Sequence, residues 1–252
     1  MVPKPPDPLP DSSLTALRAK RAADYPPDPI PDIIPGGGIS LIAGASGIGK
    51  TAFLSWWTTR FRDGLPIFGH PVNPVPEQVI LAIDRSWVQS TSKWFEAAGF
   101  PEIRAYSPLD DPTFSPSRMR RKDRRLGVLV EFLDKLQPPP GAVVYIDPMA
   151  PFLGGQLNDY DACSTACMEI RELSRNLRIT IIGTCHTAKL KADPKDRYQR
   201  VQDRILGSAA LLGYTDTQMY LASPEETAHN YYEFTWNPHH ARQATFPMAR
   251  DP

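Results

Sequence analysis

The chain has 252 residues, a length that suits one α/β domain or one domain with an appended arm. Its 28 Lys and Arg residues balance its 28 Asp and Glu residues, so contact with a polyanion would need a local basic patch. Three cysteines cannot form a fully paired disulfide framework, and neither a signal peptide nor an apolar run of roughly 18–20 residues is present, so we expect a soluble cytoplasmic protein without membrane contact.

Proline-rich sequence dominates residues 1–35, where PKPPDPLP and YPPDPIPDIIP flank the stretch SSLTALRAKRAA. Proline fixes φ and removes a backbone donor, so we expect extended segments around a short helix capped by Ser12 or Ser13. Two interpretations of this N-terminal arm stay open: a disordered leader, or an arm that packs on a neighbouring subunit. Residues 36–252 would then form the folded domain.

Apolar strands alternate with helices from Gly38 onward. Such continuous apolar strands are typical of a parallel sheet with helices on both faces, which predicts an α/β fold. Later in the chain, TQMYLA, YYEFTWN and RQATFPMA follow one another with short turns and predict antiparallel strands at the sheet edge. The other predicted strands are 39–44, 78–84, 103–107, 142–147 and 180–186, and the predicted helices are about 50–62, 90–100, 118–136 and 160–176.

A glycine-rich turn after the first predicted strand matches G-x-x-x-x-G-K-[ST] in full. Glycines let backbone N–H groups surround an oxyanion, and the following helix offers its positive N-terminus to phosphates. In this motif Lys50 reaches the β- and γ-phosphates, and the Thr51 hydroxyl binds Mg²⁺. We expect ATP and Mg²⁺ as cofactors, with nucleotide contacts from Gly44, Ala45, Ser46, Gly47, Ile48, Gly49, Lys50, Thr51 and Ala52.

A second carboxylate for the magnesium is expected at the end of a neighbouring buried strand. AVVYID ends in Asp147, for which the alternative is an ordinary strand-capping aspartate. Pro148 stands where many ATPase classes carry a catalytic glutamate, so the group that activates water must come from elsewhere. Asp84, at the end of QVILAID, is the candidate, and its alternative role is a helix N-cap. TIIGTCH places His186 where it could sense the γ-phosphate.

These segments together resemble the RecA-like ATPases, and within them the plasmid RepA-type hexameric helicases, from about Ile33 to the C-terminus. The resemblance is carried by PGGGISLIAGASGIGKT, VILAID, VVYIDPMAPF, IIGTCHTAK and GSAALLGYTDTQMYL. The histidine motif of that family reads HH-x-x-K, and this chain keeps His186 and Lys189 with Cys185 in the first position. Gly207-Ser208 matches a later Gly-Ser of the family, whose fold also has antiparallel C-terminal strands.

The resemblance implies an oligomeric ring, with a hexamer favoured, in which a basic residue of one subunit completes the site of its neighbour. Stabilisation of the transferring phosphoryl group in this way contributes about 10³–10⁵ in rate. The equivalent loop also lines the central channel and touches single-stranded DNA, so the same residues are candidates for both roles, with a solvated surface loop as the alternative. The candidates are Lys189, Lys191, Arg197, Arg200 and Arg204.

Two further segments bear on DNA. PFLGGQLNDYD, from Pro151 to Asp161, follows Asp147 where members of the resembling family carry another channel loop, but it is acidic rather than basic. RMRRKDRR, from Arg118 to Arg125, carries six basic residues without interleaved aromatic residues. It would suit phosphate contacts, a solvated helix start or a subunit interface, but base stacking is not indicated.

Several other residues are expected to be structural. Cys163 and Cys167 share a helix face but lack the spacing of a zinc site, and the pair His239-His240 has no third ligand nearby. Core or interface positions are expected for Trp56, Trp57, Tyr214 and Tyr220.

Three functions are compatible with these features. The first is an ATP-hydrolysing RecA-like motor acting on DNA, of the RepA helicase type. The second is a nucleotide-switched regulatory or scaffold ATPase with slow turnover, favoured by Asp84 because the base of the resembling family is usually a glutamate. The third is a small-molecule kinase, against which the Asp147-Pro148 pattern and the missing arginine-bearing lid count.

Overall fold

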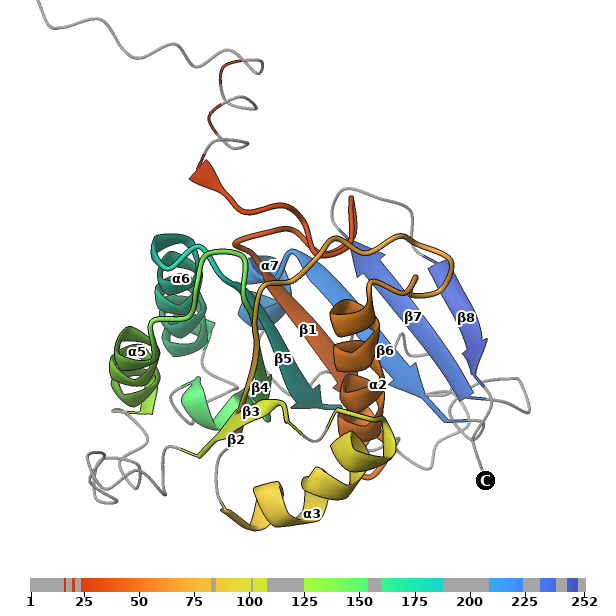
Figure 1. Ribbon diagram of the computed structural model, residues 1–252. Helices are drawn as coiled ribbons and strands as arrows, with labels where there is room; N and C mark the ends of the chain where they lie inside the picture. Colours follow the sequence, from red (N-terminus) through yellow and green to blue (C-terminus); the bar gives the residue numbers. More distant parts are fainter. Residues whose placement is uncertain are drawn as a thin grey trace, which may run out of the picture.

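A single eight-stranded sheet forms the centre of the computed structural model (Figure 1). The structure describes residues 24–82, 85–100, 102–107, 125–153, 160–187, 209–223, 232–238 and 244–248, together with residues 16 and 20. The strands are β1 (Ile39–Gly44), β2 (Gln78–Ala82), β3 (Arg104–Tyr106), β4 (Val143–Asp147), β5 (Thr180–His186), β6 (Thr217–Ala222), β7 (Tyr232–Pro238) and β8 (Ala244–Met248). The helices are α2 (Lys50–Asp63), α3 (Arg85–Ala97), α5 (Arg125–Leu136), η2 (Ala150–Phe152), α6 (Tyr160–Asn176) and α7 (Ala209–Tyr214).

The strand order is β3-β2-β4-β5-β1-β6-β7-β8. All neighbours from β3 to β6 pair in parallel, and β7 and β8 add antiparallel strands at one edge, which confirms the predicted α/β fold class. One detail differs from the expectation. TQMYLA forms β6, which pairs in parallel with β1 and antiparallel only with β7, so it joins the two parts of the sheet.

Helices cover both faces of the sheet (Figure 1). α2 and α3 pack on one face through Phe53, Leu54, Trp57 and Phe95, and α5, α6 and α7 pack on the other. The inner strands are therefore buried from both sides and consist of apolar runs, as parallel strands require. Each large apolar side chain that is fully buried in this way contributes roughly 1.5–3 kcal/mol to the free energy of folding. Among the described helices, none is both long and apolar enough to cross a bilayer.

The described part of the predicted N-terminal arm packs on its own chain. The backbone N–H of Gly36 donates to Asp28 Oδ1 at 2.8 Å, and a Cβ on Gly36 would lie 2.0 Å from the Pro26 carbonyl oxygen. The backbone at Gly36 passes so close to the backbone at Pro26 that no larger residue fits at position 36. The core residues contributed by this segment are Ile30, Ile33 and Ile34. The division of the chain at residue 36 stays a prediction.

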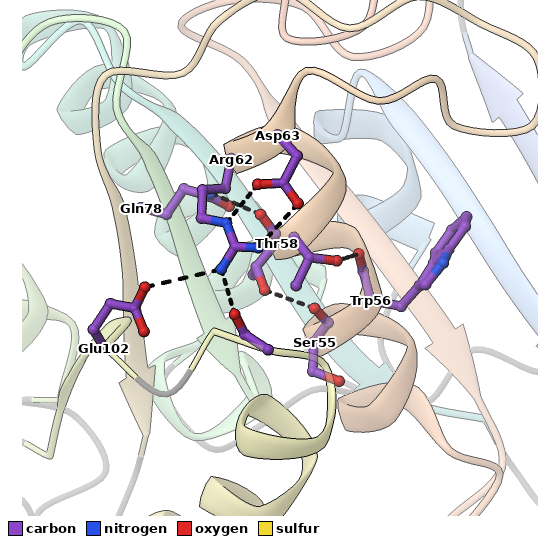
Figure 2. Close-up of polar contacts among 9 residues, drawn as sticks. Ser55, Trp56, Thr58, Arg62, Asp63, Gln78 and Glu102 are labelled. Atoms are coloured by element: carbon purple, nitrogen blue, oxygen red, sulfur yellow. Dashed lines mark hydrogen bonds and ion pairs between the residues drawn. The ribbon is translucent and has the colours of Figure 1, made fainter.

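Polar contacts fasten α2 to its neighbours (Figure 2). Near its C-terminal end Arg62 donates to the Asp63 carboxylate and to the Gly99 carbonyl oxygen after α3. In the core, Gln78 of β2 donates through Nε2 to the Thr58 carbonyl oxygen at 2.9 Å and accepts the Tyr145 hydroxyl at 2.8 Å. Gln78 thus links the C-terminal half of α2 to β2 and, through Tyr145, to β4.

Candidate nucleotide-binding site

The glycine-rich turn lies between the end of β1 and the start of α2. Gly47 and Gly49 have φ values of 77° and 101°, and no atom lies within 4 Å of the position of a Cβ on either residue. These two glycines are therefore required for their left-handed backbone conformation rather than for space. Gly44 is required for space, because a Cβ there would lie 2.9 Å from the Leu221 carbonyl oxygen and 3.0 Å from Ile48 Cγ2.

The N-terminus of α2 has the features of an anion-binding site. Gly49 occupies the N-cap and provides no side-chain cap, and the first turn of the helix carries no acidic residue. Ser46, Gly47 and Gly49 are exposed. The backbone N–H groups of this turn can therefore reach a phosphate, which would also experience the positive end of the helix dipole.

Lys50 is buried within the turn that it would serve. Its ammonium group donates to the carbonyl oxygens of Gly44 and Ala45 at 2.9 and 2.8 Å and lies 3.2 Å from His186 Nδ1. An ammonium group has no acceptor, so His186 Nδ1 must be unprotonated in this contact. Burial, together with the positive charge of Lys50, lowers the pKa of His186, and the opposing effect of Asp147 is smaller. The imidazole is therefore neutral at pH 7.

Asp147 lies at the end of β4 and is 5% exposed. Thr51 Oγ1 donates to Asp147 Oδ2 at 2.8 Å, and Thr184 Oγ1 donates to Asp147 Oδ1. Two residues that are 96 positions apart in the sequence, Thr51 and Asp147, thus place a hydroxyl and a carboxylate side by side. Mg²⁺ prefers oxygen ligands of this kind, so Thr51 and Asp147 would hold the ion, which when bound neutralises charge on the phosphates.

Parallel pairing brings the site together. β5 lies between β1 and β4, and the register aligns Gly44 with His186. Polar groups at the carboxyl ends of these strands therefore meet at one edge of the sheet, where open α/β sheets bind ligands. β2 pairs with β4 so that Ala82 aligns with Asp147, two residues before Asp84.

Several predicted residues lie outside the described parts of the chain, and their roles stay predictions. They include Asp84 itself and most of the basic cluster that begins at Arg118. The others are Gly154, Gly155, Lys189, Lys191, Arg197, Arg200, Arg204, Gly207, Ser208, His239 and His240.

Thr184 was not predicted as part of the site. The only sequence signal for it is its spacing, because it precedes His186 by two residues in a strand and must share a sheet face with it. Its contact with Asp147 depends on the pairing of β4 with β5, which the sequence alone does not display.

Of the residues expected to be structural, Trp57 and Tyr220 are buried in the core, and Trp56 and Tyr214 are partly buried and pack against it. Trp57 is fully buried, and the Tyr220 hydroxyl donates to Gln218 Oε1 at 2.9 Å. Burial raises the pKa of the Cys185 thiol to about 12, so this cysteine is a weak nucleophile at neutral pH. Within the described residues, no group of three or more His, Cys, Asp or Glu side chains could hold a metal ion, and Cys163 and Cys167 are buried.

A family model described as AAA domain matches residues 5–192, well over half of the chain. The matched region contains the glycine-rich turn, Asp147 and His186, and it begins within the predicted N-terminal arm. No curated protein matches the sequence.

Proposed function

The chain belongs to the AAA domain family and is a P-loop ATPase, and we propose that it works as a magnesium-dependent RecA-like motor that acts on DNA. The observation that carries this proposal is the set of contacts at the carboxyl ends of strands β1, β5 and β4. There Lys50 meets His186, and Thr51 meets Asp147. These two contacts support the proposal, because each joins two residues with related proposed roles: phosphate binding and γ-phosphate sensing for Lys50 and His186, and magnesium binding for Thr51 and Asp147.

Each side chain has a proposed role. Lys50 leaves the carbonyl oxygens of Gly44 and Ala45 to bind the β- and γ-phosphates. Thr51 and Asp147 hold Mg²⁺. His186 exchanges its contact with Lys50 for one with the γ-phosphate, so the protein can register whether that phosphate is present.

Asp84 is the proposed group that orients the attacking water. The pairing of Ala82 with Asp147 supports this role, because it shows that β2 ends beside the carboxylate that is proposed to bind magnesium, two residues before Asp84. If Asp84 is the base, Asp84→Asn should bind ATP normally and lose most of its turnover, since an amide cannot accept the proton. Full activity of Asp84→Asn would place the base elsewhere.

Action on DNA is supported by the family, which is associated with RecA-like and helicase-type proteins. The basic sequence from Lys189 to Arg204 supports both a contact with single-stranded DNA and a residue that acts in the site of a neighbouring subunit. A ring of several copies, with six favoured, would make both roles possible.

The decisive experiment measures steady-state ATP hydrolysis with and without single-stranded DNA, with Lys50→Ala as the inactive control. The proposal expects DNA to increase turnover and the increase to decline with added salt, because phosphate contacts release counterions. Light scattering on the same samples reports the number of subunits. Turnover that is unchanged at every DNA concentration would contradict a DNA motor.

A nucleotide-switched scaffold is the second candidate, and the aspartate at position 84 favours it. Aspartate is one methylene shorter than glutamate, so it would hold the attacking water in a different place. Negligible hydrolysis by the wild type, together with a gain of hydrolysis in Asp84→Glu, would favour this second function over the first.

A further inference from the structure

Thr184 holds the end of β4 at two points. Its side chain donates through Oγ1 to Asp147 Oδ1, and its carbonyl oxygen accepts the backbone N–H of Met149 at 2.9 Å. The neighbouring Gly183 makes room for this arrangement, because a Cβ there would lie 2.4 Å from Met149 Sδ. The centre of β5 therefore fixes both the carboxylate of Asp147 and the chain that follows it.

We propose that Thr184 is a positioning residue of the magnesium site, acting through Asp147. The bond from Thr184 Oγ1 engages Oδ1, so that Oδ2 faces the Thr51 hydroxyl at 2.8 Å. This inference rests on the proposed function in one respect, since it takes Thr51 and Asp147 as the residues that hold Mg²⁺.

A free carboxylate would not keep this orientation. The terminal torsion of aspartate is broad, so the plane of the carboxylate is set by its hydrogen bonds rather than by its rotamer. Threonine is stiff at χ1, and Thr184 is completely buried in the middle of the sheet, so its hydroxyl is a fixed donor. Hydrogen bonds of this kind to a metal ligand typically change metal affinity by about 10–100-fold when they are removed.

Thr180 offers a matched control on the same strand. It is also completely buried and lies on the same face of β5, four residues before Thr184. Its hydroxyl serves the opposite edge of the sheet, where it accepts the Gly37 N–H at 3.3 Å and donates to the Pro35 carbonyl oxygen at 3.4 Å. Replacement of either threonine by valine removes one buried hydroxyl at constant shape, but only Thr184 contacts Asp147.

The test titrates Mg²⁺ into the full chain with a fluorescent ATP analogue in the absence of DNA. Thr184→Val should raise the Mg²⁺ concentration at half-maximal binding by about tenfold or more. Thr184→Ser should restore the wild-type midpoint, because it keeps the hydroxyl. Thr180→Val should lower the melting temperature without moving the midpoint.

A second background separates positioning from a general loss of structure. In Asp147→Asn, addition of Thr184→Val should shift the Mg²⁺ midpoint far less than it does in the wild type, because both changes act on one carboxylate. Equal midpoints for wild type and folded Thr184→Val would overturn the role of Thr184 alone. Nucleotide binding by the wild type that does not respond to Mg²⁺ would overturn the proposed magnesium site as well. Thr184→Ser serves as the test variant if Thr184→Val does not fold, and a tenfold shift in its midpoint with wild-type melting would contradict the role of the hydroxyl.

Discussion

The carboxyl ends and the amino ends of the parallel strands, called here the carboxyl edge and the amino edge of the sheet, carry similar polar side chains with different partners. The carboxyl edge has Asp147, Thr184 and Lys50, and the amino edge has a corresponding carboxylate, threonine and cation in Asp216, Thr180 and Arg171. Each edge thus contains a buried or largely buried carboxylate with a hydrogen-bond donor on each oxygen.

At the amino edge, the carboxylate forms a hydrogen bond with the backbone of a neighbouring strand. Asp216 Oδ2 accepts the Ile39 N–H at 2.9 Å and Oδ1 accepts Arg171, so this carboxylate fastens the start of β1 to α6. At the carboxyl edge, Asp147 accepts hydroxyl groups from two threonines, and Lys50 meets the imidazole of His186. Side chains can exchange such partners for a ligand without unfolding a strand. We therefore expect the amino edge to serve stability and the carboxyl edge to serve ligand binding.

The largest expected effect is on catalysis at the carboxyl edge. Lys50→Ala removes the side chain that is proposed to bind the β- and γ-phosphates, and ATP hydrolysis should fall by about 10²–10³-fold or more. Steady-state hydrolysis measures the loss, and Lys93→Ala on the exposed face of α3 is the matched control. Wild-type turnover in a folded Lys50→Ala protein would refute the assignment of this turn.

The next effect is on stability at the amino edge. Asp216→Ala removes the acceptor for Ile39 and the partner of Arg171, and the free energy of unfolding should fall by about 2–3 kcal/mol. Urea unfolding measures this change. ATP affinity of the folded protein should stay at the wild-type value, and a large loss of affinity would break the division between the two edges. Asp63→Ala, which removes an exposed partner of Arg62, should leave the urea midpoint unchanged.

A smaller effect is expected from the packing behind the carboxyl edge. Gly183→Ala would force Met149 to move, which should cost about 1–3 kcal/mol of stability and raise the Mg²⁺ midpoint of nucleotide binding. Gly127→Ala in α5 is the control, because an added Cβ there would meet nothing within 4 Å beyond the adjacent backbone of its own helix, and it should be neutral or stabilising. An unchanged Mg²⁺ midpoint in Gly183→Ala would show that Asp147 is positioned independently of Met149.

The smallest effect concerns pH. The pKa of His186 is lowered in the folded protein from its usual value of about 6.5, so the unfolded chain binds the proton more readily. Stability is then fully present above about pH 6.5 and declines as the pH falls toward the lowered pKa. His186→Gln keeps an acceptor for Lys50 and does not titrate. Between pH 8 and pH 5.5 the melting temperature of the wild type should fall further than that of the variant, and parallel melting curves would contradict this.

Local sequence was sufficient for the parts of the site that are contiguous. The glycine-rich turn was predicted because its chemistry needs particular residues at successive positions, and Gly47 and Gly49 have the left-handed conformation that this requires. The helix predicted at 160–176 was confirmed as α6, and the strand predicted at 180–186 as β5, since apolar periodicity is a local property.

Only the tertiary structure decided which distant residues meet. The parallel pairing of β6 with β1, the packing of Ile30 into the core and the bond from Thr184 to Asp147 each depend on segments that lie far apart in the sequence. The sequence by itself determined an α/β protein with a phosphate-binding turn and a carboxylate at the end of a buried strand. It could not determine the partners of that carboxylate, because hydrogen bonds between strands depend on sheet order and register, which arise from the packing of the whole chain.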